Sequence, residues 1–73
     1  NKVLGLLINE MEQKEIEYLI KRELEELLLD LEDSRIDSVT KKSMRKRYQK
    51  LFQLLLRVAN REECLPYIPA RNI

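Results

Sequence analysis

Hydrophobic residues recur at helical spacing over two long stretches of the chain. The first stretch carries an apolar stripe at spacings of three or four, which consists of Ile16, Ile20, Leu24, Leu27 and Leu31. The second carries a stripe at the same spacings, which consists of Met44, Tyr48, Leu51, Leu55 and Val58. Such spacings place the side chains on one face of an α-helix. The pattern therefore predicts two amphipathic helices and no strands.

The start of the first helix is marked by a capping signature. Asn9 is followed three residues later by Glu12, so each side chain can bond the backbone N–H of the other residue. We therefore expect the first helix over 10–32. The apolar run that begins at Val3 leaves room for an extension of this helix back to residue 3.

A polar stretch over residues 33–37 separates the two stripes. Its side chains compete for backbone hydrogen bonds and are poor helix-interior residues, which predicts a connection between the helices. Asp37 or Ser38 would then cap a second helix over 38–59.

One uninterrupted helix is the alternative to two, because no Gly or Pro breaks the chain between the stripes. A heptad continued from Leu31 would place Ser38 and Arg45 in the apolar seam, whereas the apolar residue is Met44. The register therefore favours an all-α fold in which two helices of similar length form an antiparallel hairpin.

A second capping signature, from Asn60 to Glu63, predicts a short helical turn over 61–65. Prolines at positions 66 and 69 predict an extended tail over 66–73, since residues before proline avoid the helical region. We expect apolar tail residues to pack over the open end of the hairpin, near the N-terminal segment: Leu65, Tyr67 and Ile68. The chain, 1–73, is expected to form a single domain.

A chain of 73 residues has little core of its own. Area scaling gives about 60% of the surface buried on folding, which is marginal for a lone domain. Two hairpins could complete a core by pairing as a homodimeric four-helix bundle. The face predicted for this self-association is apolar and lies outside the two stripes: Met11, Tyr18, Leu19, Leu29, Phe52, Leu54 and Leu56. Scattered exposed leucines and a groove for another protein's helix are the alternatives.

Charge is strongly divided along the chain although the net charge is only +1. Residues 10–33 hold ten acidic and three basic side chains, whereas 35–57 hold eight basic and one acidic. An antiparallel hairpin brings the two groups side by side. The basic cluster at the start of the second helix consists of Lys41, Lys42, Arg45, Lys46, Arg47 and Lys50.

We favour a solvated or internally paired face as the interpretation of this basic cluster. The alternatives are a nucleic-acid contact, in which Tyr48 could stack on an exposed base, and a contact with an acidic protein.

The composition argues against an enzyme. Without His there is no imidazole base or ligand, one Cys excludes a thiolate metal site, and one Gly excludes a glycine-rich phosphate loop. We predict no catalytic, metal or cofactor site. Cys64 is expected to be a packed apolar residue in a reducing compartment, the cytoplasm, and the apolar run before Asn9 is too short to span a membrane.

These patterns lead to a functional hypothesis. The chain is expected to be a small non-enzymatic interaction or regulatory module that recognises a partner through a helix face, as a homodimer or with an acidic or helical protein. A nucleic-acid-binding hairpin that uses the basic cluster is the alternative.

Overall fold

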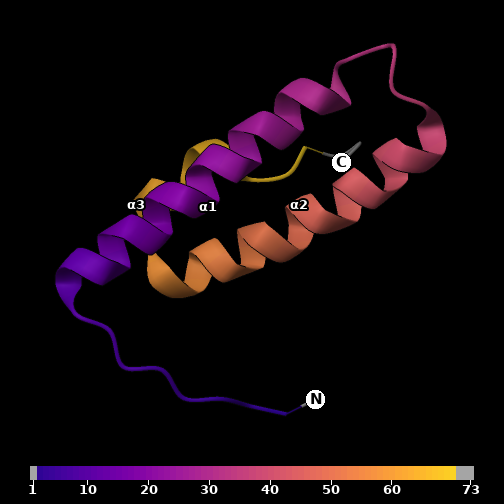
Figure 1. The fold of residues 1–73 in the computed structure, drawn as a ribbon. Coiled ribbons are helices and arrows are strands. Elements are labelled where there is room, and N and C mark those ends of the chain that lie inside the picture. Colours follow the sequence, from indigo (N-terminus) through magenta and orange to yellow (C-terminus); the bar gives the residue numbers. More distant parts are fainter. Residues whose placement is uncertain (1, 71–73) are drawn as a thin grey trace.

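A computed structural model describes residues 2–70; residue 1 and the end of the predicted tail, 71–73, lie outside the described residues. Two long helices, α1 (Glu10–Leu31) and α2 (Ser38–Val58), run side by side in opposite directions (Figure 1). The short helix α3 (Arg61–Cys64) and a 3-10 turn, η1 (Leu65–Tyr67), lead the chain back along the pair. The fold is the predicted all-α hairpin, and the alternative of one long helix is wrong.

Helix α1 begins where its cap requires. The backbone N–H of Glu12 donates to the side chain of Asn9 (2.8 Å), and the N–H of Asn9 donates to the carboxylate of Glu12 (2.9 Å). Both partners of the predicted capping box are thus in place. The expected extension back to residue 3 is not observed, because Asn9 has an extended backbone and residues 2–8 carry no regular structure.

The connection between the helices is closed by its own polar groups. The guanidinium of Arg35 makes a hydrogen bond of 2.8 Å to Asp33, whose other oxygen accepts from the backbone N–H of Arg35. Asp37 then caps α2 by accepting from the N–H of Thr40 (2.7 Å). Bonding to these N–H and guanidinium groups lowers the pKa of both aspartates. Each long helix ends one residue earlier than the sequence predicts, at Leu31 and at Val58.

The core lies along the seam of the hairpin and includes a residue from α3. Its buried side chains are Ile20, Leu24 and Leu27 from α1, Tyr48, Phe52 and Leu55 from α2, and Cys64 from α3. Leu51 of the predicted stripe is only half buried, whereas Phe52 is 8% exposed. Helix α2 therefore turns its buried side partly towards α3, since two neighbours rather than one cover it.

The second predicted capping box does not form. Asn60 occupies the cap position of α3, but its side chain makes no capping hydrogen bond. The carboxylate of Glu63 instead accepts a bond from Lys21 of α1. This tertiary contact explains the difference, because the carboxylate that would complete the box is turned towards the other helix.

The expected extended tail begins with the 3-10 turn η1, in which Pro66 occupies an early position where its missing N–H is tolerated. Of the three residues expected to pack over the hairpin, Tyr67 joins the core margin, but Leu65 and Ile68 are more than half exposed. The tail crosses the side of the hairpin rather than its open end (Figure 1).

The two caps give a matched test of the N-terminal signal. We expect Asn9→Ala to lower the free energy of unfolding by about 1 kcal/mol, because it removes the side-chain oxygen that accepts from the N–H of Glu12 in a formed capping box. The control is Asn60→Ala, which removes a cap residue without a side-chain hydrogen bond and should change stability by less than half as much. Urea denaturation measures both values, and equal losses would contradict the assignment.

Candidate functional site

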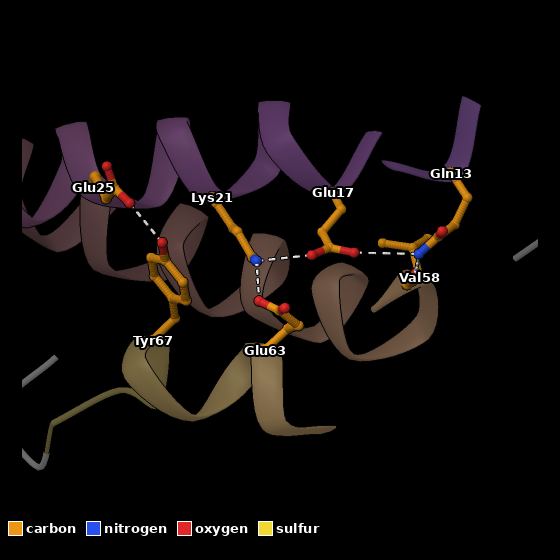
Figure 2. A network of polar contacts seen from close by, with 7 residues as sticks. All are labelled: Gln13, Glu17, Lys21, Glu25, Val58, Glu63 and Tyr67. Carbon is orange, nitrogen blue, oxygen red and sulfur yellow. Dashed lines mark hydrogen bonds and ion pairs between the residues drawn. The ribbon is translucent and has the colours of Figure 1, made fainter. Parts of the chain in front are cut away.

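One face of the hairpin is covered by the C-terminal segment. Four polar residues of α1 at intervals of four form a row along this face: Gln13, Glu17, Lys21 and Glu25. Figure 2 shows the contacts of these four residues, which are made with one another, with the end of α2, with α3 and with the tail. At one end of the row the amide of Gln13 donates to the backbone oxygen of Val58 and to Glu17.

Lys21 is the centre of this row. Its ammonium donates to Glu17, four residues earlier, at 2.8 Å and to Glu63 of α3 at 2.6 Å. The hydrogen bond to Glu17 and then that to Glu63 raise the pKa of Lys21 above its ordinary value, and the bond from Lys21 lowers the pKa of Glu63. Lys21 therefore stays protonated and joins α1 to α3.

Two tyrosines fasten the tail beside this ion pair. The hydroxyl of Tyr48, in the core, donates to the backbone oxygen of Tyr67 at 2.7 Å. The hydroxyl of Tyr67 donates to the carboxylate of Glu25 at 2.5 Å. Burial, with a smaller effect from the bond to Glu25, raises the pKa of Tyr67 to about 12. Both hydroxyls act as donors, so the neutral phenols are the forms that hold the tail.

Within residues 2–70, the opposite side of the seam has no such cover. Each residue of an α-helix turns about 100° from the one before, so Leu19 and Lys21 flank the buried Ile20 on opposite sides. In the same way Leu54 and Leu56 flank Leu55, which is fully buried. Lys21 faces α3, and Leu56 lines a groove with α3 and the tail. Leu19 and Leu54 therefore lie on the uncovered side.

We call this uncovered surface the open face. Residues three or four positions apart lie on the same side of a helix, so the open face continues along both helices from Leu19 and Leu54. It consists of Glu12, Ile16, Leu19, Glu23 and Glu26 from α1 and Arg47, Leu51, Leu54 and Val58 from α2. An ion pair between Glu23 and Arg47 (3.6 Å) joins the two rows directly. The face is apolar towards the start of α1 and charged towards the connection between the helices.

The apolar part of the open face is accessible. Leu19 is 58% exposed and Leu54 44% exposed, while Ile16, Leu51 and Val58 are half buried. Beside it, the extended N-terminal segment and the start of α1 form an open groove of about 680 Å³, which is lined by Leu6, Ile8, Met11, Glu12, Glu15 and Ile16. Contiguous apolar surface of this kind is typical of interaction sites.

The residues predicted for self-association do not form one surface. Met11, Tyr18 and Leu29 lie on the back of α1, because steps of seven and eleven residues keep them in one row opposite the core. Leu56 lies on the tail side in a groove of about 330 Å³. Phe52, which we expected at the surface, is part of the core, because α3 covers that side of α2. Of the predicted residues, Leu19 and Leu54 share the open face.

The basic cluster of α2 is largely without acidic partners. Lys42, Lys46 and Lys50 are exposed at intervals of four, and Lys41 and Arg45 are half buried. Among residues 2–70, Arg47 is the member of the cluster that makes an ion pair. Asp33, just after α1, bonds to Arg35 within the connection, and the nearby charge of Lys41 makes a smaller contribution to its lowered pKa.

Tyr48 does not offer a stacking surface to a base. Its side chain is 1% exposed, and its hydroxyl is bonded to the tail. The expectation that it could stack on nucleic acid is therefore wrong, because the position belongs to the core of the hairpin. Any contact of the cluster with nucleic acid would be limited to charge and hydrogen bonding with phosphates.

Other functional features are few in the part of the chain that the structure describes. Residues 2–70 contain no group of three His, Cys, Asp or Glu side chains that could hold a metal ion. Cys64 is a free, buried thiol. Neither long helix combines the length and apolar character needed to cross a bilayer.

Comparison with models of protein families, with curated proteins and with solved structures finds no match to this chain. The candidate site therefore depends on the geometry of the chain itself.

Sequence reasoning missed the polar row and the division of the apolar surface into faces. The signal for the row is present as polar residues at 13, 17, 21 and 25, four apart. The signal for the faces is the pair of leucines that flank a buried position, as Leu54 and Leu56 flank Leu55. Their meaning depends on which side α3 covers, and this is a tertiary property.

The tyrosine contacts predict a loss of stability in alkali. The pKa of Tyr67 is about 12 in the folded chain and about 10 in an unfolded one, so folding favours the neutral phenol. Its contribution to the free energy of unfolding is fully present below pH of about 10 and disappears as the pH rises to about 12. Burial raises the pKa of Tyr48 as well, and its contribution has the same sign.

We expect Tyr67→Phe to lower the free energy of unfolding at neutral pH by about 1 kcal/mol, since one hydrogen bond is lost. The substitution should also make the free energy of unfolding decline less steeply between pH of about 10 and 12. Urea denaturation across this range measures both effects, with Tyr18→Phe on the exposed back of α1 as the control. A Tyr67→Phe variant with the full alkaline decline would refute the role of this hydroxyl.

Proposed function

We propose that this chain is a small non-enzymatic interaction or regulatory module that recognises its partner through the open face. The supporting observation is the difference between the two sides of one hairpin. One side is covered by α3 and the tail, whereas the other keeps Leu19 and Leu54 accessible above a half-buried apolar floor. Apolar anchors surrounded by charged residues are the usual composition of a protein-binding surface.

The chemistry of the open face defines the kind of partner. Its apolar centre fits the apolar stripe of a helix or a helix pair. Its two helices contribute opposite charge, with Glu12, Glu23 and Glu26 on α1 and Arg47 on α2, so a partner with charges in the reverse order is favoured. A homodimer meets these requirements, as would another helical protein, and the free thiol of Cys64 is compatible with action in the cytoplasm.

A photo-reactive phenylalanine derivative at position 54 tests the proposal. We expect irradiation to give a covalent adduct whose partner peptide, identified by mass spectrometry, belongs to an amphipathic helix. The matched control carries the same group at position 56, which is equally exposed on the same helix but lies on the tail side.

Adducts should form at position 54 and be at least about fivefold weaker at position 56. This ratio reflects the selectivity of a specific interface for its central residues. Equal yields at both positions, or no adduct at position 54, would contradict recognition through the open face.

Nucleic-acid binding is the second candidate, and one observation favours it. Lys42, Lys46 and Lys50 form an exposed row without acidic partners among residues 2–70, and α2 contains no acidic residue. Such a row can neutralise successive phosphates without reading base sequence. This candidate uses the outer side of α2 and leaves the open face free.

Salt dependence tests this candidate directly. If the lysine row binds phosphates, the affinity for a labelled single-stranded oligonucleotide should fall steeply with salt, and replacing Lys42, Lys46 and Lys50 by Gln should reduce the logarithmic slope by about 2. Fluorescence anisotropy at several salt concentrations measures the slope, with Lys14→Gln on α1 as the control. Absence of binding at about 50 mM salt would eliminate the candidate.

A further inference from the structure

The two helices that border the open face carry opposite net charge. Helix α1 holds eight acidic and three basic residues, whereas α2 holds seven basic and none acidic. Within residues 2–70 one ion pair, Glu23–Arg47, joins them across the seam. On the open face itself, α1 contributes three acids, Glu12, Glu23 and Glu26, and α2 contributes one base, Arg47.

Two hairpins can be stacked face to face by a two-fold axis in two ways. An axis along the helices places α1 of each copy over α2 of the other, with both connections at the same end. An axis across the helices places α1 over α1 and α2 over α2, with the connections at opposite ends. Both arrangements give antiparallel neighbours, so helix direction does not distinguish them.

Charge distinguishes the two arrangements. With the axis along the helices, the acidic helix of one copy faces the basic helix of the other on both sides of the dimer. With the axis across the helices, acidic faces acidic and basic faces basic. Juxtaposed like charges oppose association, so only the first arrangement is complementary.

The distribution of apolar residues leads to the same choice. Leu19 and Leu54 both lie between the Gln13–Val58 and Glu23–Arg47 contacts, hence at similar heights along the hairpin. An axis along the helices preserves height, so Leu19 of one copy meets Leu54 of the other, while Glu23 and Glu26 lie over Arg47 of the second copy. An axis across the helices reverses height and moves the apolar part towards charged residues.

From these two observations we infer that the occupant of the open face is a second copy of this chain, stacked with the two-fold axis parallel to the helices. This inference rests on the proposed function of the open face and adds the identity and orientation of the partner. The result is a four-helix bundle in which α3 and the tail lie on the outside, because they cover the other face of each hairpin.

The size of the face is adequate for such a dimer. Helix α1 is about 33 Å long, and two adjacent helices are about 20 Å wide, which gives a plane of roughly 650 Å². A corrugated surface of this extent approaches the approximately 800 Å² that each partner contributes to a stable interface.

The assembly is tested first by size and by two matched substitutions. Light scattering should give twice the chain mass of 8.8 kDa. Leu54→Glu should raise the dimer dissociation constant at least about tenfold, because it places two like charges in the apolar centre, whereas Leu56→Glu should change it less than about twofold. Leu54 and Leu56 are 44% and 43% exposed, so the comparison tests the face and not exposure.

The orientation is tested by the distance between the two connections. A spin label attached through Ser34→Cys, at an exposed position of the connection, reports this distance by double electron–electron resonance. Connections at the same end should give about 20–30 Å, and connections at opposite ends should give more than about 40 Å, roughly one helix length further. Dilution with unlabelled chain should weaken the signal and so identify it as intermolecular.

Each outcome bears on a different part of the inference. A dimer with the short distance and the selective Leu54→Glu effect supports it. A dimer with the long distance overturns the orientation, and equal effects of the two substitutions overturn the choice of face. A chain that stays at 8.8 kDa overturns the second copy as occupant, while adducts of position 54 with another helical protein would still support the proposed function.

Discussion

Two helices that pack side by side bury only the surface along their single seam. The rest of this fold is determined by how the remaining apolar surface is covered. Each helix buries one stripe, and the seam accommodates six large side chains together with Cys64. A chain of this size gains too little from one such contact to be strongly stable alone. The C-terminal segment covers one side of the seam, and the other side remains as the open face.

The covering segment is held by polar contacts in addition to the buried side chain of Cys64. Leu65 and Ile68 stay largely exposed, while the tail is fastened through the Tyr48 and Tyr67 hydroxyls and through Lys21. Hydrogen bonds and ion pairs of this kind depend on donor–acceptor direction and on protonation, whereas apolar contacts are non-directional and carry no titrating group. The covered face thus has a different chemistry from the open face, although both border the same core.

Local signals in the sequence were sufficient for the helices but not for the faces. The capping box at Asn9, the cap at Asp37 and the two apolar stripes predict the hairpin because each depends on residues close together in the chain. The failures on the covered side have one cause. The position of α3 buries Phe52 and turns Glu63 away from Asn60, and no pattern of local spacing reveals where a short third helix will lie.

The absence of acidic residues from α2 has a consequence for how the protein would respond to a ligand. Its first turns carry positive charge where the helix macrodipole is already positive, so intrinsic preferences do little to stabilise this helix. The stability of α2 must therefore come from packing against α1 and α3, because the local charge destabilises it. The open face, which is built half from α2, therefore exists only while the hairpin is folded, and any molecule that occupies it draws the folding equilibrium towards the native state.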